Sequence, residues 1–495
     1  MCDGRKIPLL SKSRFTAGLQ CHKRLYLECY SRELADEVSE QQQAIFDAGT
    51  DVVALARQLF PGGILIREDY FDHEGAMAST QEALSLPAVP PVYEAAFLYD
   101  GVRMRADVLA PQGGERFDLV EVKSTSRVKD EHIYDAAIQL YVLRGRGLTI
   151  RRACVCHLNT DYVYEGGDYD LSGLFRVVDV TAECSLVQPE IPALLADMRA
   201  MLARPEPPDI PTGRHCTTPY QCQFYGHCHA DELEHHVSQL PRAGQGLLSA
   251  LEAAGIEDIR DIPASFPGLS PLQRRVRDAV LSGRAYLDTE LSRRLRRLRP
   301  PIHFLDFETF NPALPRYQGS RPYQVIPFQW SLHTLDSDGT LEHREFLHEG
   351  AGDPRRAFAE SLVSALGDSG PVLVYSGFEA SRLRELAFLF PELSPQISAI
   401  LNGRIVDLLQ LVRAYCYHPG FHGSFSIKAV LPALVPNLGY DDLAINDGTL
   451  AAMAYAEMVK PDTTRDRRAE IRRNLLAYCE RDTLAEVELF RYFTR

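Results

Sequence analysis

The sequence predicts an α/β protein with more than one domain, and three observations lead to this prediction. The chain has 495 residues, which is too long for one ordinary hydrophobic core. In its N-terminal half, strand-like runs such as RFDLVEVKST alternate with helical patterns such as SEQQQAIFDAGTDVVALARQLF. A second stretch of this kind begins at the strand-like PIHFLDFETF and continues to the C-terminus. We therefore expect two α/β domains.

Composition indicates where the domains meet. A Pro-rich stretch, ARPEPPDIPTGRHC, is followed by three cysteines and then by the polar HADELEHHVSQLPRAG. After it come short helical patterns, among them LLSALEAAGIEDIRDI, which is similar to a helix-hairpin-helix that lacks its second glycine. The expected domains are residues 1–232 and 299–495, joined by a helical segment at 233–298.

Bulk composition predicts a cytoplasmic globular protein. No apolar run is long enough to span a bilayer, and the polar start MCDGRKIPLLSKSRF lacks the apolar core of a signal peptide. Eleven cysteines without an export signal indicate thiols or metal ligands rather than disulfides. The net charge of -14 argues against a generally basic nucleic-acid coat, although clustered carboxylates can bind cations that offset it.

Two carboxylates and a lysine lie on neighbouring predicted strands in RADVLAPQGGERFDLVEVKST. Side chains alternate along a strand, so Glu121 and Lys123 share a face, and Asp107 can meet them from the preceding strand. Paired carboxylates bind Mg²⁺ or Mn²⁺, which can activate water and stabilise charge on a phosphodiester. An E-x-K pair alone is common on exposed strands. The flanking strand, its aspartate and the helix that follows favour a hydrolytic site.

These residues resemble the motif of the PD-(D/E)XK nucleases, specifically the RecB-like branch. The resemblance implies that Asp107 and Glu121 bind the metal and that Lys123 is catalytic. In that branch the helix after the lysine carries a glutamine, which here is Gln139 in DEHIYDAAIQLYVLRG.

Two features of the RecB-like branch are missing. The tyrosine that often follows the glutamine by four residues is absent, because Tyr141 lies on a different helix face. The histidine that commonly lies upstream, after a glycine, is absent from AGTDVVALA, and Glu94 is the substitute that we consider.

Three evenly spaced cysteines, Cys216, Cys222 and Cys228, follow the first predicted core in RHCTTPYQCQFYGHC. One further soft ligand would complete a tetrahedral set, and the close C-x-x-C pairs of a zinc ribbon are absent. RecB-like nucleases of the AddB and CRISPR-associated type hold a 4Fe-4S cluster with three such cysteines and a lone N-terminal one. The resemblance implies that Cys21 in GLQCHKRLYLE is the fourth ligand. Zinc and plain buried thiols are the alternatives.

A second pair of carboxylates, Asp306 and Glu308, stands in the otherwise apolar PIHFLDFETF. Both point to one face of the predicted strand, and buried neighbouring carboxylates repel each other unless a cation lies between them. Near the C-terminus, the helical AEIRRNLLAYCERDTLAEVELF carries Tyr478 and Asp482 on an otherwise apolar stripe. This stripe should face the sheet that holds the carboxylate pair, so the two segments together predict a metal site.

A D-x-E strand with a C-terminal Y-x-x-x-D helix resembles the DEDD, or DnaQ-like, exonucleases of ribonuclease H-like fold. In that family four acids bind two metal ions and the tyrosine positions the attacking water. The resemblance implies metal-binding roles for Asp306, Glu308 and Asp482 and a catalytic role for Tyr478.

The middle acid of that family is usually an aspartate, and this sequence offers two candidates for its place. Glu379 in PVLVYSGFEASRLRELA stands at the matching position, and Asp407 in GRIVDLLQL is the second candidate. The longer glutamate could move the metal, so a nucleic-acid-binding scaffold with a degenerate C-terminal site is one alternative function.

The helical segment is locally basic within an acidic chain, and we expect the nucleic-acid backbone there. A solvated helix face paired with acids is an equal alternative. Lys428 in GSFSIKAVLPAL is either a phosphate contact or a solvated lysine. The arginines of the helical segment are Arg274, Arg275, Arg277, Arg293, Arg294, Arg296, Arg297 and Arg299.

Nearly the whole chain resembles a bacterial family, a domain of unknown function, in which a RecB-like unit with cysteine ligands is joined to a DnaQ-like unit. The resemblance implies a restriction-endonuclease-like fold followed by a ribonuclease H-like fold. It also implies metal chemistry, but no known biological task. Our hypothesis is a nuclease dependent on Mg²⁺ or Mn²⁺ that cuts single-stranded or frayed DNA and trims 3′ ends, in repair or defence. An RNA-directed 3′–5′ exonuclease is the other alternative function.

Overall fold

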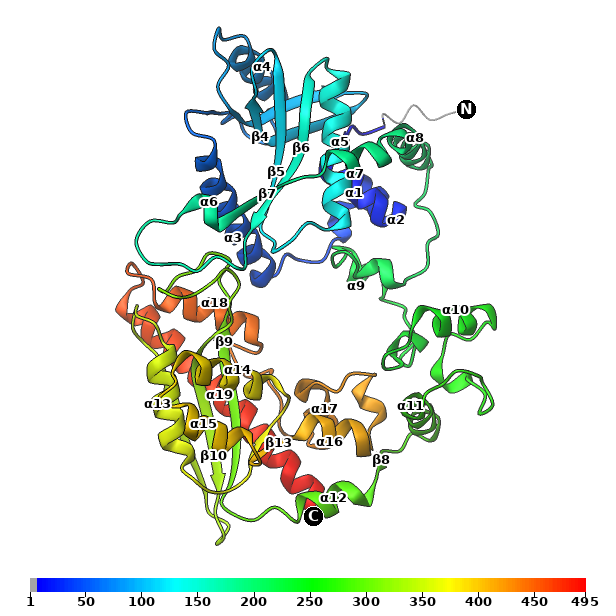
Figure 1. The fold of residues 1–495 in the computed structure, drawn as a ribbon. Coiled ribbons are helices and arrows are strands. Elements are labelled where there is room, and N and C mark those ends of the chain that lie inside the picture. Colours follow the sequence, from blue (N-terminus) through cyan, green and yellow to red (C-terminus); the bar gives the residue numbers. More distant parts are fainter. Residues whose placement is uncertain (1–6) are drawn as a thin grey trace. The chain divides into compact units, whose positions relative to one another are not determined.

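The computed structural model describes residues 7–495, and the chain divides into two compact units (Figure 1). Unit 1 comprises Met1–Asp231 with Pro312–Gln324, and unit 2 comprises Glu232–Asn311 with Val325–Arg495. Each unit combines a sheet with helices, so the predicted α/β class is confirmed in both. No helix of the described residues is long and apolar enough to cross a membrane.

Unit 1 is built on a seven-stranded sheet with the order β2-β3-β4-β5-β6-β7, and β1 pairs with β4 outside this path. Strands β3, β4 and β5 form an antiparallel meander, after which β6 pairs in parallel with β5. Strand β2 is only two residues long. The strands are β1 (Leu10–Ser11), β2 (Ile64–Leu65), β3 (Val92–Tyr99), β4 (Val102–Pro111), β5 (Arg116–Lys123), β6 (Thr149–Leu158) and β7 (Phe175–Asp179).

Helices cover both faces of this sheet, because alternate residues of its strands are apolar on either side. Leu119 of β5 packs into the core under α5 and α8, whereas Val120 and Val122 pack on the opposite face with α3. The parallel β5–β6 pair requires a crossover connection, and α5 supplies it. The helices are α1 (Lys12–Gln20), α2 (His22–Tyr30), α3 (Glu40–Ala56), α4 (His73–Leu84), α5 (Asp130–Gly145), α6 (Leu171–Leu174), α7 (Thr181–Val187), α8 (Ile191–Leu202) and α9 (Tyr225–Cys228).

Unit 2 contains a five-stranded sheet with the order β11-β10-β9-β12-β13. Strand β9 is central: it pairs antiparallel with β10 and parallel with β12. A separate pair joins β8 and β14. The strands are β8 (Tyr286–Leu287), β9 (Ile302–Phe310), β10 (Ile326–Leu335), β11 (Leu341–Leu347), β12 (Val372–Val374), β13 (Ile405–Asp407) and β14 (Cys416–Tyr417).

The two faces of this sheet are covered by different helices. Leu305 and Phe307 of β9 pack against α13, α14 and α15 on one face. Phe304 points to the other face, where its ring meets Phe490 of the long helix α19. The helices are α10 (Gln245–Ala253), α11 (Pro271–Ser282), α12 (Thr289–Leu295), α13 (Arg355–Leu366), α14 (Phe378–Leu389), α15 (Ser394–Leu401), α16 (Leu408–Tyr415), α17 (Ile427–Leu434), α18 (Gly448–Met458) and α19 (Arg465–Thr494).

Candidate active sites

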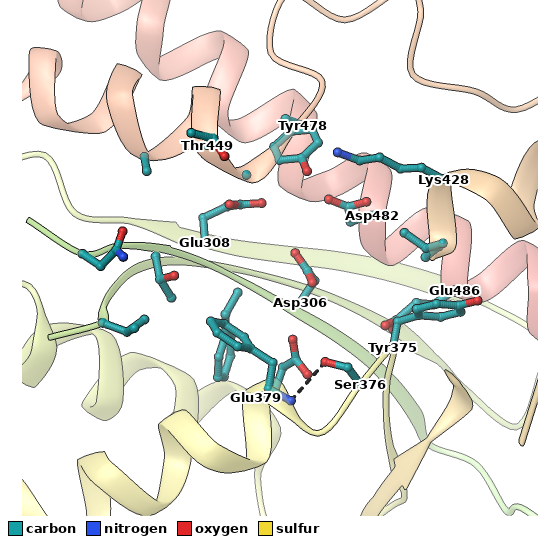
Figure 2. A pocket seen from close by; sticks show the side chains of 18 residues that line it. Asp306, Glu308, Tyr375, Ser376, Glu379, Lys428, Thr449, Tyr478, Asp482 and Glu486 are labelled. Carbon is teal, nitrogen blue, oxygen red and sulfur yellow. Dashed lines mark hydrogen bonds between the residues drawn. The ribbon is translucent and has the colours of Figure 1, made fainter. Parts of the chain in front are cut away.

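Five carboxylates line one cavity of unit 2, which has a volume of about 490 Å³ (Figure 2). Asp306 and Glu308 come from β9, Glu379 comes from α14, and Asp482 and Glu486 come from α19. The structure thus brings together four carboxylates that the sequence singled out on three separate elements. Glu486 was not among the residues expected from the sequence.

The periodicities of β9 and α19 direct these side chains into the cavity. Asp306 and Glu308 are two residues apart on a strand, so both project to the face that α19 covers. Tyr478, Asp482 and Glu486 follow one another at intervals of four on α19, which is close to one helical turn. Glu486 therefore continues the stripe that the sequence showed, and the spacing of four from Asp482 was a signal that could have found it.

Glu379 enters the cavity from the first turn of α14, where the helix dipole favours a carboxylate. The backbone N–H of Phe378 donates to Ser376 Oγ at 3.0 Å and fixes the start of this helix. Asp407 has a different role, because its oxygens accept from the backbone N–H and the side-chain amide of Gln410 and cap α16. Of the two candidates for the middle acid, Glu379 lines the cavity and Asp407 does not.

Burial raises the pKa of every carboxylate in the cavity. The pKa values of Asp306, Glu308 and Glu486 lie well above the ordinary range, because burial is reinforced by repulsion from neighbouring carboxylates. Burial also raises the pKa of Glu379 to about 8 and that of Asp482 to about 6. Holding several of these groups ionised together requires a positive charge among them.

One lysine and two tyrosines approach the carboxylates. Among the residues that line the cavity in the described chain, Lys428 is the one cationic side chain. Its Nζ lies 5.2 Å from the ring centroid of Tyr478 and 5.5 Å from that of Tyr440, and it donates to Asn446 O at 2.6 Å. Tyr440 OH donates to Asp482 Oδ1 at 2.5 Å, which favours the ionised carboxylate. Lys428 is thus part of the cavity wall rather than a freely solvated side chain.

The donor set of the cavity fits a hard divalent cation. Carboxylate oxygens are the ligands that Mg²⁺ and Mn²⁺ prefer. Oxygens of Asp306 and Glu308 lie with the sulfur of Cys479 within 4.8 Å of one another. The buried Glu379 Oε2 accepts no hydrogen bond. Neither oxygen of Glu486 accepts one of standard geometry, although two backbone N–H groups are near enough to lower its pKa. Buried acceptors of this kind need a partner, and a cation would supply it.

The second carboxylate set lies on the sheet of unit 1, around the buried Glu121 at the end of β5. Glu121 accepts hydrogen bonds from Lys12 Nζ at 2.6 Å and from Gln139 Nε2 at 2.6 Å, and Lys123 Nζ lies 2.8 Å from it. Asp107 on β4 accepts from a backbone N–H of β5 at 2.7 Å. The structure therefore brings together the four unit 1 residues expected from the sequence and adds Lys12.

Asp135 is a further member of this set that the sequence did not reveal. It lies one turn before Gln139 on α5 and pairs with Lys123, and Lys12 Nζ is 3.8 Å from it. The spacing of four between Asp135 and Gln139 was a usable signal. Lys12 gave none, because it reaches Glu121 from the first turn of α1, more than a hundred residues away in the chain.

Lysines keep Glu121 ionised. Burial alone would raise its pKa, but Lys12 and Lys123 outweigh burial and hold the pKa of Glu121 below its usual range. Burial, followed by repulsion from Glu121, raises the pKa of Asp107 to about 7. The ammonium groups of Lys12 and Lys123 thus offset much of the negative charge of this carboxylate set.

Glu94, considered as a substitute for the missing histidine, lies near the carboxylate set of unit 1, whereas Tyr141 does not. Glu94 lies on β3 in the left-handed region, with a φ of 57°, and pairs with Arg57 at 2.5 Å. It is near enough to contribute to the raised pKa of Asp107. Tyr141 points elsewhere, because its OH donates to Asp100 Oδ2 at 3.0 Å.

The four cysteines expected to act as ligands line one small cavity of unit 1, of about 20 Å³. They come from the α1–α2 junction and from the segment that ends with α9. Backbone N–H groups donate to the sulfurs of Cys216 and Cys222 at 3.4 and 3.5 Å. Four soft sulfur donors thus line one cavity, a donor set that an iron–sulfur cluster or another thiophilic metal accepts. The four are Cys21, Cys216, Cys222 and Cys228.

The arginines of the helical segment belong to unit 2 and have divided roles. Arg277 is buried, and Arg293 and Arg294 both pair with a glutamate of their own helix. Arg274 and Arg275 line a surface hollow of about 470 Å³. Arg293 and Arg294 therefore fit the alternative of a helix face paired with acids. The hollow lined by Arg274 and Arg275 is the part of the segment that is open to a ligand.

The fold and the cavity define a class: an α/β protein with a carboxylate-lined cavity suited to a divalent cation. A DUF2779 domain, described as a domain of unknown function, is found at residues 303–426, a segment that contains β9 and Glu379. We expected a resemblance to such a family over nearly the whole chain, and the match covers residues 303–426 of it. No curated protein matches the chain.

Proposed function

We propose that the protein is a metal-dependent nuclease that hydrolyses phosphodiester bonds of DNA, and that unit 2 is its 3′–5′ exonuclease. The observation that supports this proposal is the cavity in which four buried carboxylates and the half-buried Asp306 meet one lysine. Carboxylates gathered in this way hold cations, and carboxylate-bound Mg²⁺ or Mn²⁺ is a common means of phosphodiester hydrolysis.

The topology of unit 2 supports a ribonuclease H-like fold of the DnaQ type. The D-x-E strand β9 is central in its sheet, and the Y-x-x-x-D helix α19 lies over the face to which Asp306 points. In unit 1, the meander β3–β5 followed by the α5 crossover to β6 supports a PD-(D/E)XK fold, because it sets the aspartate strand beside the E-x-K strand.

In unit 2, Asp306, Glu308, Glu379 and Asp482 would hold the metal ions. When bound, these ions supply an activated water and stabilise charge on the phosphate. Glu486 lies one helical turn beyond Asp482 on α19, and its oxygens can accept from a metal-bound ligand or a water.

Lys428 and Tyr478 are placed to act on the substrate directly. Lys428 Nζ is held at the wall by Asn446 O and can donate to a phosphate oxygen. Tyr478 lies one turn before Asp482 on α19, and its OH can orient the attacking water.

A hollow next to the cavity supplies a path for the strand. It has a volume of about 570 Å³ and shares Tyr375 and Ile427 with the carboxylate cavity. Arg242 and Arg413 line it together with Phe425. Cations beside an aromatic ring suit the phosphates and bases of a single strand.

Unit 1 is proposed as a second nuclease site, which cuts single-stranded or frayed DNA. Asp107 and Glu121 would hold a metal ion there, and Gln139 keeps Glu121 oriented through its 2.6 Å hydrogen bond. Lys123 Nζ provides a positive charge at the reacting phosphate. The four cysteines are proposed to hold a 4Fe-4S cluster that joins the start of unit 1 to the segment before α9, a structural role.

The test is cleavage of end-labelled DNA and of RNA of the same sequence by the full-length protein with Mg²⁺ or Mn²⁺. Asp306→Ala should remove stepwise 3′ shortening, and Lys123→Ala should remove internal cuts. Asp407→Asn, which keeps its helix cap, should cleave like the parent. If both site variants retain all cleavage, both assignments fail. Degradation of RNA alone would favour the RNA-directed function, and binding without metal-dependent cleavage would favour the scaffold.

The cluster has a test of its own. Protein purified without oxygen should be brown, with a broad visible absorbance that disappears in Cys222→Ser. Cys416→Ser, which changes a buried cysteine of unit 2, should keep the colour. Stoichiometric zinc without iron would contradict the iron–sulfur assignment.

A further inference from the structure

A second group of metal-ligating side chains lies in unit 2 outside the carboxylate cavity. His333 of β10, His343 of β11 and Glu480 of α19 each offer one ligand atom, and these atoms lie within 4.8 Å of one another. None of the three residues lines the carboxylate cavity.

The register of the sheet brings the two histidines together. His333 is directly opposite His343 in the antiparallel β10–β11 pair, and the centroids of their rings are 4.5 Å apart. Directly opposed residues of neighbouring strands point to the same face. Helix α19 packs against both strands on that face, and Glu480 comes from this helix.

Hydroxyl groups fix both imidazole rings. His333 Nδ1 lies 2.8 Å from Thr483 Oγ1, and His343 Nε2 lies 2.9 Å from Ser331 Oγ. The two hydroxyl oxygens are 2.7 Å apart, and Thr483 Oγ1 donates to Glu480 O at 3.1 Å. The network is satisfied when each ring donates to its hydroxyl and Ser331 donates to Thr483. In that arrangement His333 Nε2 and His343 Nδ1 carry free lone pairs.

This arrangement is the one that metal-binding histidines need. Such histidines donate their second ring N–H to a fixed acceptor, which sets the tautomer and the ring orientation. His343 Nδ1 lies 3.8 Å from Glu480 Oε1, so this nitrogen and the carboxylate are near enough to bind one ion. His333 is buried, which favours the neutral ring that a ligand must be.

We propose that His333, His343 and Glu480 bind one zinc ion. Two imidazole nitrogens and a carboxylate oxygen form a donor set that Zn²⁺ accepts, whereas Mg²⁺ prefers oxygen ligands alone. Tetrahedral bonds of about 2.0–2.2 Å require ligand atoms about 3.4 Å apart. The half-exposed side chain of Glu480 can rotate to meet that requirement, and water completes the coordination.

The ion would fasten the edge strand β11 and its neighbour β10 to α19. This helix also carries Tyr478 and Asp482, so the ion would hold the helix that completes the carboxylate cavity. The binding itself does not depend on which reaction the cavity performs.

The test is a zinc titration of the full-length protein, first stripped with a chelator and then kept in excess Mg²⁺. Magnesium occupies oxygen-only sites without competing for imidazole. His343→Ala should bind one zinc ion fewer per chain than the parent, because the cysteines are common to both proteins. With Co²⁺ in place of zinc, the parent-minus-variant spectrum should show visible bands without sulfur-to-metal charge transfer, since no thiolate is a ligand.

Two further variants make the result decisive. Glu480→Gln changes a half-exposed side chain, so the fold should persist while zinc affinity falls at least about tenfold. His348→Ala is the matched control, since His348 follows β11 and its Nδ1 contacts Tyr455 OH instead, so it should bind zinc like the parent. Equal zinc content and affinity in the parent, His343→Ala and Glu480→Gln would overturn the proposal.

Discussion

In unit 1 the carboxylates of the candidate site lie among lysines, whereas in unit 2 five carboxylates share a cavity with one lysine. Glu121 contacts Lys12 and Lys123 directly, and its pKa is held below the usual range. The pKa values of the five carboxylates in the unit 2 cavity are all raised. Glu121 of unit 1 is therefore kept ionised by its lysines, whereas the carboxylates of the unit 2 cavity, like Asp107 of unit 1, are pushed towards the neutral form.

In unit 1 the lysines of the protein offset the charge of the carboxylates, whereas the carboxylates of the unit 2 cavity require added cations. A carboxylate paired with buried ammonium groups is stable without metal, and a cation that binds there must compete with the lysines. Carboxylates that mainly repel one another gain the most when a cation arrives. Metal should thus change the stability of unit 2 far more than that of unit 1, and removing single charges should have opposite effects in the two units.

The largest expected effect is on catalysis in unit 2. Asp306→Asn removes a metal-binding oxygen at the centre of the cavity and should lower the rate of 3′ shortening about 10³-fold, because metal stabilisation contributes several kcal/mol. The rate should be measured in a Lys123→Ala background, so that the unit 1 site adds no cleavage. Asp407→Asn in the same background is the control. An unchanged rate for Asp306→Asn would remove the cavity from the mechanism.

The next effect is on the stability of unit 1. Lys12→Ala leaves Glu121 with one ammonium group fewer and should lower the free energy of unfolding by about 3 kcal/mol. The only tryptophan, Trp330, lies in unit 2. Urea unfolding followed by circular dichroism should therefore shift, while the tryptophan fluorescence transition should not. Lys129→Ala removes a more exposed lysine and should cost less than about 1 kcal/mol; equal losses in the two variants would contradict the charge balance.

The sequence allowed prediction wherever the site depends on local periodicity. Asp306 with Glu308, and Tyr478 with Asp482, are visible because strands alternate and helices repeat about every four residues. The same helical repeat also points to Glu486. In a helix rich in arginine and glutamate, however, a glutamate looks like an exposed residue until its burial is known.

Other members of the sites depend on contacts that no local pattern encodes. Lys12 reaches Glu121 only because the two-residue strand β1 pairs with β4 and sets the start of α1 beside β5. Tyr440 reaches Asp482 from a segment without regular structure. Tertiary packing places such residues in the sites, and no local sequence pattern identifies them. The fold class is easier to predict, because each long strand and helix carries its own apolar periodicity.

A third effect is the pH dependence of unit 2 without metal. The pKa of Glu379 is about 8 when folded and near 4.5 when unfolded. Between these values the unfolded chain releases a proton that the folded chain keeps, so stability falls as the pH rises from about 4.5 to about 8. Glu379→Gln cannot ionise and should be more stable than the parent by about 4 kcal/mol at pH 8, with little difference at pH 4.5.

This effect can be measured by urea unfolding followed through Trp330 fluorescence in the presence of a chelator. Adding Mn²⁺ should stabilise the parent more than Glu379→Gln, because the variant has lost both a repelling charge and a ligand. A variant that is less stable than the parent at pH 8 would show that Glu379 is not under electrostatic strain.

The smallest effect tests a single hydrogen bond of unit 2. Tyr440 OH donates to Asp482 and favours its ionised form, so Tyr440→Phe should raise the pKa of Asp482 above its present value of about 6. A protonated carboxyl group binds a cation poorly, so the Mn²⁺ concentration for half-maximal exonuclease rate should rise about tenfold. The rise should be larger at pH 6 than at pH 8.5, where Asp482 is ionised in both proteins. Tyr417→Phe, whose hydroxyl accepts from Gly423 N away from the carboxylates, should leave that concentration unchanged at both pH values. A rise that is equal at the two pH values would mean that Tyr440 shapes the cavity by packing rather than by holding a proton donor against Asp482.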